Sequence, residues 1–184
     1  MMTANESTAP PTESSARVLV AGRGEANVDT GIPVLDHLVG VLARYAGFDL
    51  VLEVAPAAEE AEVAAAGRAL GEALAEPLHG AEARRYGSAS VPADEALAHV
   101  ALEASELPRL VSNVDLSEAH VAGIDRDVVA TFLEELTVAS RLTLHVRLIG
   151  GEDTQHVLDS IFKTLGVALG RACRPAPWSR AEGG

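Results

Sequence analysis

The sequence lacks several features that define whole classes of protein. Its only cysteine is Cys173, which excludes an intramolecular disulfide and a cysteine-based metal site and fits a reducing cytoplasm. The chain has only 14 Lys and Arg residues but 27 Asp and Glu residues, so the positive charge that binding to nucleic-acid phosphates requires is scarce. No apolar run reaches membrane-spanning length, and no charged-then-apolar leader begins the chain. We therefore expect a soluble, cytoplasmic protein with no nucleic-acid or membrane partner.

The 184 residues instead have the composition of a globular protein, with 48% hydrophobic and 22% charged residues. This length allows one domain with a full core or two fused half-size units. Residues 1–15 are rich in Thr, Ser, Glu and Pro and offer little apolar surface to offset the entropy of ordering. They predict a disordered lead-in, and residues 175–184 are expected to form a C-terminal tail.

Residues 142–169 carry the most informative pattern. Residues 142–148 alternate between apolar and polar side chains, which predicts a half-buried strand with His145 on its polar face. After two glycines, Asp153 or Thr154 can cap a helix whose apolar residues recur every three or four positions. The opposite side of this helix carries His156, Asp159 and Lys163. Since residues three and seven apart share a helical face, we expect these side chains to project together beside the strand of His145.

The rest of the chain predicts short elements in a repeated order. Strands are expected at residues 17–21, 26–29, 48–54, 84–91, 98–103 and 109–114, and helices at 34–46, 57–76 and 128–140. The motif LGEAL at residues 70–74 is echoed by LGVAL at residues 165–169, and in both cases a helix and a strand lie upstream. We therefore expect an α+β fold of two similar halves, residues 16–80 and 81–174, each a sheet with helices on one face.

Several motifs resemble the imidazoleglycerol-phosphate dehydratase family of histidine biosynthesis. TGIPVLDHL at residues 30–38, RRYG at 84–87, PADEAL at 92–97, LHV at 144–146 and QHVLD followed by FKT at 155–164 are similar to that family's TGIxFLDHM, RRYG, PMDEAL, LHI and HHxxE–FKA segments. The resemblance covers residues 30 to about 174. It implies two halves related by a pseudo-twofold axis, the ribosomal protein S5 domain 2-like architecture.

The resemblance also implies a metal centre, two manganese ions held by six histidines and two glutamates. His37, His145 and His156 occupy ligand positions, and Asp159 stands where the family has a glutamate. Gln155 replaces one histidine, and residues 60–65 read EAEVAA, so Ala61 and Ala64 stand where a histidine and a carboxylate of the first HHxxE motif should coordinate. An alanine methyl cannot coordinate an ion. We therefore expect no required cofactor, with one divalent ion, Mn or Zn, as the alternative for His37, His145, His156 and Asp159.

The matching cationic residues imply a small-molecule ligand that carries a phosphate. By resemblance Arg84 or Arg85, together with Lys163, contacts the substrate phosphate. The alternative is that the two arginines form surface ion pairs, as charged residues in acidic proteins commonly do.

Three functions remain open. The first is a diverged lyase or isomerase that acts on a different small molecule, with His37, His145, His156 and Asp159 as proton carriers. The second is a non-catalytic assembly or regulatory subunit, with an authentic dehydratase as its partner. Conventional dehydration of imidazoleglycerol phosphate ranks third. We expect a homo-oligomer, and a trimer rather than the family's 24-subunit shell, because metal-dependent contacts between subunits lose ligands.

Overall fold

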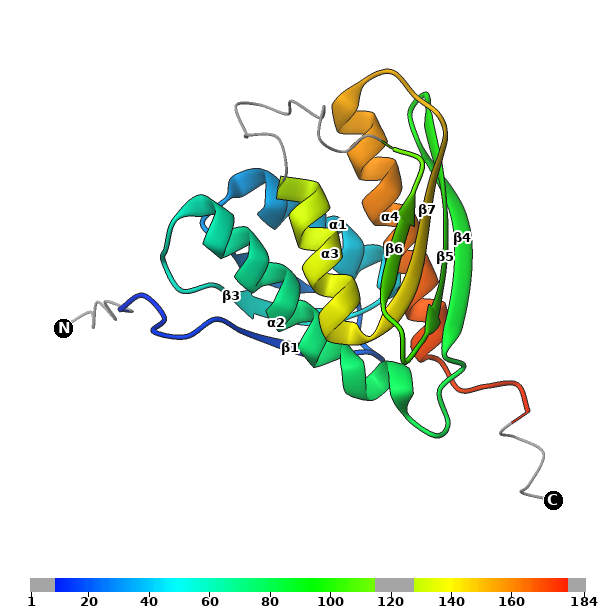
Figure 1. Ribbon diagram of the computed structural model, residues 1–184, viewed down its shortest axis with the longest axis horizontal. Coiled ribbons are helices and arrows are strands. Elements are labelled where there is room, and N and C mark those ends of the chain that lie inside the picture. Colours follow the sequence, from blue (N-terminus) through cyan, green and yellow to red (C-terminus); the bar gives the residue numbers. More distant parts are fainter. Residues whose placement is uncertain (1–8, 115–127, 179–184) are drawn as a thin grey trace, which may run out of the picture.

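The computed structural model describes residues 9–114 and 128–178, and within these ranges two sheets pack with four helices (Figure 1). The first half contains β1 (Ser15–Leu19), β2 (Ala26–Asp29), α1 (Pro33–Ala46), β3 (Asp49–Glu53) and α2 (Glu59–His79). The second contains β4 (Tyr86–Ala93), β5 (Ala96–Ala104), β6 (Arg109–Ser112), α3 (Val128–Ser140), β7 (Leu142–Gly150) and α4 (Thr154–Cys173). The predicted α+β class is confirmed.

The smaller sheet has the strand order β1-β3-β2, in which β1 is antiparallel and β2 parallel to β3. Leu50 and Leu52 of β3 alternate into the core, as a half-buried strand requires. Next to this sheet, α1 begins with Pro33, whose missing N–H costs nothing in the first turn, and ends at Gly47, whose φ of 72° is left-handed. These signals set the boundaries of α1 close to those predicted.

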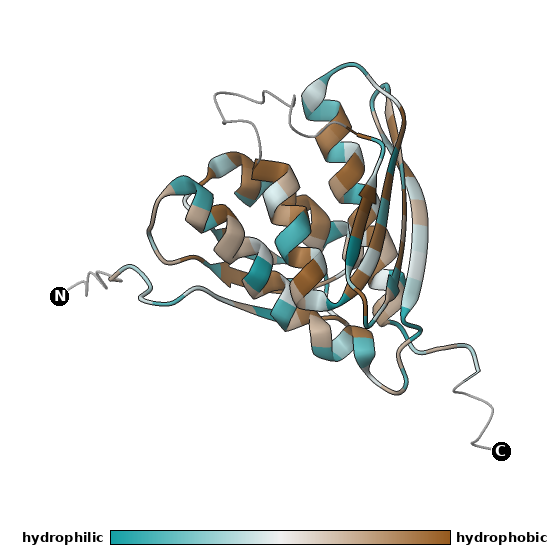
Figure 2. Ribbon diagram, viewed as in Figure 1, coloured by the Kyte–Doolittle hydropathy of each residue, from teal (hydrophilic) through white to brown (hydrophobic). Residues whose placement is uncertain are grey.

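The larger sheet has the order β4-β5-β7-β6, with β6 parallel to β7 and the other pairs antiparallel. One face is apolar: Leu144 and Val146 of β7 and Val100 of β5 are fully buried. Helices α3 and α4 cover this face, and Figure 2 shows their hydrophobic sides turned toward the sheet and toward α1 and α2. The other face carries polar side chains, among them His99 and His145.

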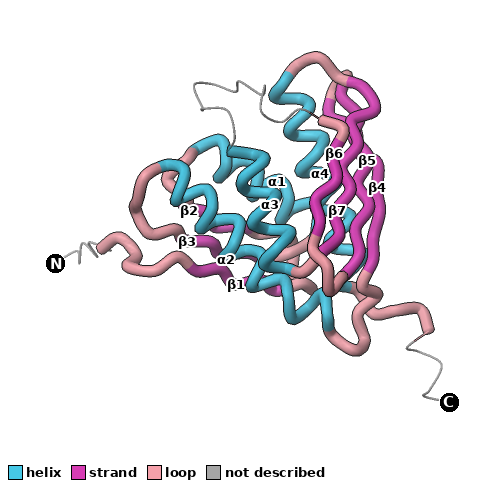
Figure 3. Tube along the Cα trace, in the orientation of Figure 1, coloured by secondary structure: helices cyan, strands magenta, loops and turns pink. Residues whose placement is uncertain are grey.

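The helices pack in two pairs that cross between the halves, α1 with α4 and α2 with α3 (Figure 3). The glycines of the echoed motifs lie at these contacts. A Cβ on Gly166 would stand 2.3 Å from the Leu42 carbonyl oxygen, and one on Gly71 would stand 2.7 Å from that of Leu136. Only glycine allows such close backbone approach. The glycine of the repeated Leu-Gly sequence therefore allows two helices to pack closely in each half.

Some boundaries differ from those expected. The first strand begins at Ser15 rather than residue 17, because Ser15 already pairs with Glu53 of β3. Helix α2 continues through Pro77 to His79, although a proline commonly ends a helix. Residues 1–8 of the predicted lead-in and 179–184 of the predicted tail lie outside the described residues. No described helix has the combination of length and hydropathy that crossing a membrane would take.

Candidate active site

The polar face of α4 carries the first group of candidate residues. Asp153 is the N-cap, and its carboxylate accepts a hydrogen bond from the His156 backbone N–H at 3.1 Å. Val157 and Leu158 are buried against the core, whereas His156 and Asp159 are half-buried. The predicted helical face is therefore formed, and its imidazole and carboxylate reach partners on other elements.

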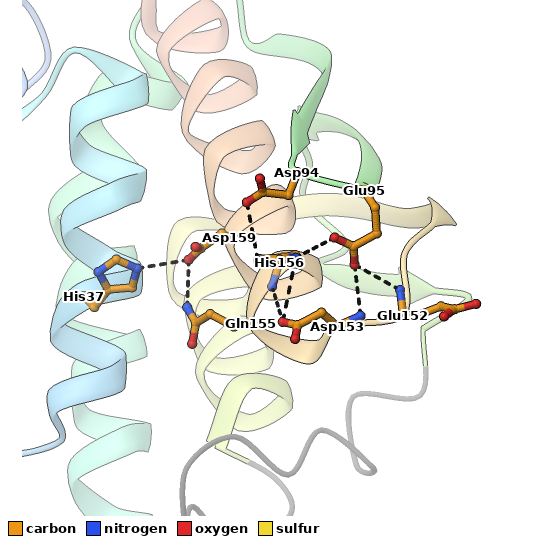
Figure 4. A network of polar contacts seen from close by, with 8 residues as sticks. All are labelled: His37, Asp94, Glu95, Glu152, Asp153, Gln155, His156 and Asp159. Atoms are coloured by element: carbon orange, nitrogen blue, oxygen red, sulfur yellow. Dashed lines mark hydrogen bonds and ion pairs between the residues drawn. The ribbon is translucent and has the colours of Figure 1, made fainter.

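His156 is held by a carboxylate that lies 61 residues away in the sequence (Figure 4). Glu95 occupies the two-residue turn between β4 and β5, and its Oε2 lies 2.5 Å from His156 Nδ1. Its Oε1 accepts hydrogen bonds from the backbone N–H groups of Asp153, at 3.0 Å, and Glu152, at 3.3 Å. Asp94 Oδ2 lies 3.4 Å from the other ring nitrogen, Nε2. One carboxylate therefore ties the hairpin turn to the start of α4.

These contacts favour the charged forms of both partners. The Asp153 backbone N–H and the His156 imidazole, among other donors, lower the pKa of Glu95 to about 2. The hydrogen bond to Glu95 raises the pKa of His156, helped by the charges of Asp153 and Asp94 and opposed by desolvation. Both shifts favour the Glu95–His156 ion pair, at a site where both side chains remain partly open to solvent.

A second imidazole–carboxylate pair lies beside the first (Figure 4). His37, near the start of α1, places Nε2 3.0 Å from Oδ1 of Asp159 on α4. The Gln155 side-chain amide donates to the same oxygen, also at 3.0 Å. His37 is 52% exposed and Asp159 is 22% exposed, so the imidazole faces solvent while the carboxylate is sheltered. The contact between α1 and α4 therefore brings together two predicted site residues that are 122 positions apart.

His145 does not join these pairs within one chain. It alternates with the buried Leu144 and Val146, so its side chain projects from the opposite face of the sheet, away from α4. There it borders an open pocket of about 340 Å³ together with Tyr86 and Glu103. The expectation that His145 lies beside the polar face of α4 is wrong for a single chain, because the sheet separates the two.

The predicted phosphate contacts also lie elsewhere. Arg84 and Arg85 adjoin the C-terminal end of α4, where their backbone N–H groups donate to the Arg174 and Ala172 carbonyl oxygens. Sixteen residues separate Ala172 from His156, or about 24 Å at about 1.5 Å per helical residue.

The side chains at this end of α4 form an aromatic stack. The Arg84 guanidinium lies 4.4 Å from the centre of the Tyr86 ring, which stacks on Trp178 at 6.5 Å. Lys163 is closer to the middle of α4, and its ammonium lies 5.6 Å from the centre of the Tyr45 ring.

The described residues of one chain do not by themselves fit a manganese centre. Within residues 9–114 and 128–178, no three or more His, Cys, Asp or Glu side chains are arranged to hold a metal ion. Position 61, at the start of α2, carries an exposed alanine. The imidazoles of His37 and His156 are each hydrogen-bonded to a carboxylate. The described residues of one chain therefore leave the set of donors incomplete.

The sequence reasoning missed Glu95 and Asp94 as site residues. Both lie in the PADEAL segment, which was recognised only as a matching motif. The available signal was an acidic pair between two predicted strands, where a tight turn projects its side chains. Strand β5, which follows the turn, pairs with β7, and β7 leads into the start of α4. This pairing brings Asp94 and Glu95 next to His156.

The fold is that of solved dehydratases. The crystal structure of imidazoleglycerol-phosphate dehydratase from Staphylococcus aureus matches with a TM-score of 0.81 and 28% identity, over 90% of this chain and 95% of that one. The enzyme from Pyrococcus furiosus matches with a TM-score of 0.76 and 26% identity, over 92% and 94%. These likenesses define an α+β protein of the dehydratase class.

The sequence relatives agree. The Desulforudis audaxviator imidazoleglycerol-phosphate dehydratase is 39% identical over 89% of this chain and 85% of its own length. The Halalkalibacterium halodurans enzyme is 35% identical over 88% and 85%. The sequence model of the imidazoleglycerol-phosphate dehydratase family matches residues 30–169. The chain belongs to the imidazoleglycerol-phosphate dehydratase family.

These matches correct the expected function. The ranking that placed conventional dehydration third is wrong, because relatives at 33–39% identity over most of the chain are dehydratases of imidazoleglycerol phosphate. Neither a different substrate nor a non-catalytic subunit finds support among them. The expectation that no cofactor is required is also unsupported, since the resemblance to this family implies a divalent metal.

Proposed function

We propose that this chain catalyses the dehydration of imidazoleglycerol phosphate. Family membership supports the substrate, because relatives named for this reaction align over most of the chain and most of their own length. The observation that carries the chemistry is the presence of two imidazole–carboxylate pairs, His156 with Glu95 and His37 with Asp159, at the N-terminal part of α4. Such paired groups are suited to proton transfer in an elimination.

Dehydration of a vicinal diol breaks a C–H bond on one carbon and the C–O bond on its neighbour. A base takes the proton, an acid protonates the departing hydroxyl so that it leaves as water, and the resulting enol tautomerises to a ketone. His156 is the proposed acid, because its hydrogen bond to Glu95 raises its pKa and favours the protonated imidazolium. His37 is the proposed base: if Nε2–H donates to Asp159, Nδ1 retains a lone pair.

The spacing of the two pairs suits this division of roles. His156 and Asp159 are three residues apart on α4, so their Cβ atoms are neighbours at about 5–6 Å. The imidazoles of His156 and His37 can therefore flank a small molecule whose reacting carbons are adjacent. Gln155 donates to Asp159 and fixes the carboxylate that faces His37.

The proposed site is completed between copies of the chain. The start of α4 lacks the cationic side chains that a phosphate requires, apart from Lys163 two turns further along. Arg84 and Arg85 are at the other end of α4, and His145 is on the far face of the larger sheet. A homo-oligomer in which these residues approach the α4 start of a neighbour would supply both the phosphate contacts and the further donors that a divalent ion needs.

A trimer is the proposed assembly, rather than a 24-subunit shell. Ala61 and Gln155 stand at two positions where the resemblance implies interfacial metal ligands. The net charge of −13 also makes assembled copies repel at low ionic strength. Light scattering with and without excess manganese tests this, and a metal-independent mass near 24 subunits would overturn it.

The catalytic proposal is tested by following ketone formation from imidazoleglycerol phosphate with purified protein, in the presence of manganese, of zinc and of a chelator. Turnover by the wild type that His156→Ala abolishes supports the proposal. A His156→Ala protein purified in the same way also controls for a contaminating host dehydratase. Absence of turnover under all three metal conditions would refute the function, provided that an authentic dehydratase is active in the same assay.

A further inference from the structure

We propose that Trp178 is a positioning residue for the proposed reaction. Through Tyr86 it holds the Arg84 guanidinium face-on, so that the N–H groups of Arg84 remain free to bind the substrate phosphate. The identity of this ligand rests on the proposed function, whereas the aromatic stack is a property of the chain alone. Trp178 lies beyond residues 30–169, the part of the chain that the family model matches, so the match assigns it no role.

The backbone next to Trp178 is held in place. After the last turn of α4 the chain runs antiparallel to residues 82–84 (Figure 1). The Ala176 N–H donates to the Glu82 carbonyl oxygen at 2.8 Å, and the Ala176 side chain is buried. Trp178 follows two residues later, so ordered backbone places its indole beside Tyr86.

The aromatic stack holds an arginine by its flat face. The Tyr86 and Trp178 rings are inclined by only 15°, with centroids 6.5 Å apart, and the Arg84 guanidinium lies 4.4 Å from the Tyr86 centroid. A guanidinium over an aromatic face keeps its N–H groups in its own plane, where two of them can bind two oxygens of a phosphate. The stack therefore fixes the orientation of the cation without using its hydrogen-bond donors.

The donors of Arg84 differ from those of other arginines in the chain. Arg68 pairs with Glu135 at 3.2 Å, and the Arg171 guanidinium donates to the Ser88 carbonyl oxygen. In contrast, Nε of Arg84 is buried and has no hydrogen-bond partner among the described residues. A buried N–H without an acceptor is unfavourable, and an oxyanion at this position would supply the acceptor.

A pocket adjoins the stack. Tyr86 lines the open pocket of about 340 Å³ that Ser88 and His145 also line, so the cation and the pocket share one aromatic side chain. Without Trp178, the Tyr86 ring loses the neighbour that restricts its rotamers, and the guanidinium over it loses its fixed orientation. Because binding of the phosphate is the same in the ground state and the transition state, we expect its loss to raise KM and to spare kcat.

A purely structural role is the alternative to be distinguished. Trp178 could serve only to anchor the C-terminal segment, and Arg84 only to place positive charge at the C-terminal end of α4, where the helix dipole favours cations. The loss of Trp178 would then lower the melting temperature and leave KM unchanged. Leu19 offers a matched control, because it is 58% exposed, against 62% for Trp178, and belongs to β1 rather than to the stack.

The test compares Trp178→Leu, Trp178→Phe and Leu19→Ala in steady-state kinetics with imidazoleglycerol phosphate. Trp178→Leu keeps apolar bulk but removes the ring, so KM should rise about 3-fold to 10-fold with kcat changed less than about 2-fold. Trp178→Phe restores a ring and should keep KM within about 2-fold of the wild-type value, as should Leu19→Ala. In an Arg84→Gln background, Trp178→Leu should raise KM no further, because Trp178 acts through Arg84.

Two results would overturn the proposal: a wild-type KM in Trp178→Leu, or a rise in KM that is just as large in the Arg84→Gln background. If Trp178→Leu does not fold, fluorescence of the wild type decides, because Trp178 is the only tryptophan in the chain. Inorganic phosphate should change its emission, and the change should be absent in Arg84→Gln. An emission that phosphate leaves unchanged in the wild type would then refute the positioning role.

The proposed function and the positioning role can fail separately. If the wild type shows no dehydratase activity, the proposed function fails, and calorimetric titration of the same variants with inorganic phosphate measures Kd in place of KM. A Trp178→Leu protein that binds phosphate as tightly as the wild type, or a wild type that binds none, would refute the positioning role in that case.

Discussion

The starts of α2 and α4 occupy equivalent places in the two halves, but they differ in chemistry. α4 begins with the side-chain cap Asp153 and presents His156 and Asp159, which bond to the β4–β5 turn and to α1, and Gln155, which donates to Asp159. α2 begins at Glu59, and its N-cap residue Ala58 makes no side-chain cap hydrogen bond. At its start Glu62 accepts a hydrogen bond from the nearby Ala57 backbone N–H. The fold uses both helices for packing through Gly71 and Gly166, whereas the two imidazole–carboxylate pairs of the described residues lie at α4.

Substitutions at equivalent positions of α4 and α2 should differ most in their effect on kcat. His156 and Ala61 correspond when the two Leu-Gly motifs are aligned. His156→Ala should lower kcat by about 10²-fold to 10⁴-fold, because a general acid is lost, and should leave the melting temperature within a few degrees. Ala61→Ser, at an exposed position, should change neither. A comparable loss of activity in Ala61→Ser would place the start of α2 in the active site and remove the contrast.

The packing glycines should matter equally in both halves. Gly166→Ala and Gly71→Ala each force a Cβ against a backbone carbonyl, at 2.3 Å from Leu42 and 2.7 Å from Leu136, so each should reduce the free energy of unfolding by about 1–3 kcal/mol or more. Gly40→Ala in α1 is the matched control. Nothing lies within 4 Å of its added Cβ, and it should gain about 0.5–1 kcal/mol. Urea denaturation at fixed protein concentration measures all three, and a neutral Gly166→Ala would show that α1 and α4 can separate.

The two helix caps allow a reciprocal test. Asp153→Ala removes the carboxylate that accepts from the His156 N–H and should cost about 1 kcal/mol of unfolding free energy. Ala58→Asp introduces a cap where α2 has none, and should gain up to about 1 kcal/mol. Equal and opposite shifts of the urea midpoint in the two variants would show that capping accounts for the difference in stability between the two helix starts. A loss in Ala58→Asp would point to a conflict with Glu59, Glu60 and Glu62 in the first turns.

The smallest expected effect is the pH dependence of stability that Glu95 and His156 give to the start of α4. Folding lowers the pKa of Glu95 from 4.5 to about 2, so its stabilising contribution is complete above pH 4.5 and is lost as the pH falls toward 2. Folding raises the pKa of His156 above 6.5, so that contribution is complete below pH 6.5 and is lost as the pH rises through the folded value.

The difference in melting temperature between the wild type and Glu95→Gln should therefore be largest between about pH 4.5 and 6.5. Calorimetry at a series of pH values measures it, with Glu60→Gln on α2 as the control that removes the same charge from an exposed helix start. A difference that is constant with pH would mean that the ion pair contributes nothing to folding.

Sequence patterns determined much of this protein by themselves. Alternation in residues 142–148 and helical periodicity after Asp153 fixed β7 and α4, because these patterns depend only on the local geometry of the backbone. The same periodicity correctly placed His156, Asp159 and Lys163 on one face of α4. Motif resemblance identified the family, which the comparisons confirmed. The predicted acid–base role of the site residues stays a prediction.

Tertiary structure decided which of these residues meet. His37 reaches Asp159 because α1 crosses α4 where Gly166 permits close approach, and Glu95 reaches His156 because the β4–β5 turn ends beside the start of α4. His145 and Arg84 are separated from them, one by a sheet and the other by the length of a helix. A sequence pattern sets the direction of a side chain relative to its own element. Which side chains come within hydrogen-bond distance depends on how the elements pack, and that is set by contacts between residues far apart in the chain.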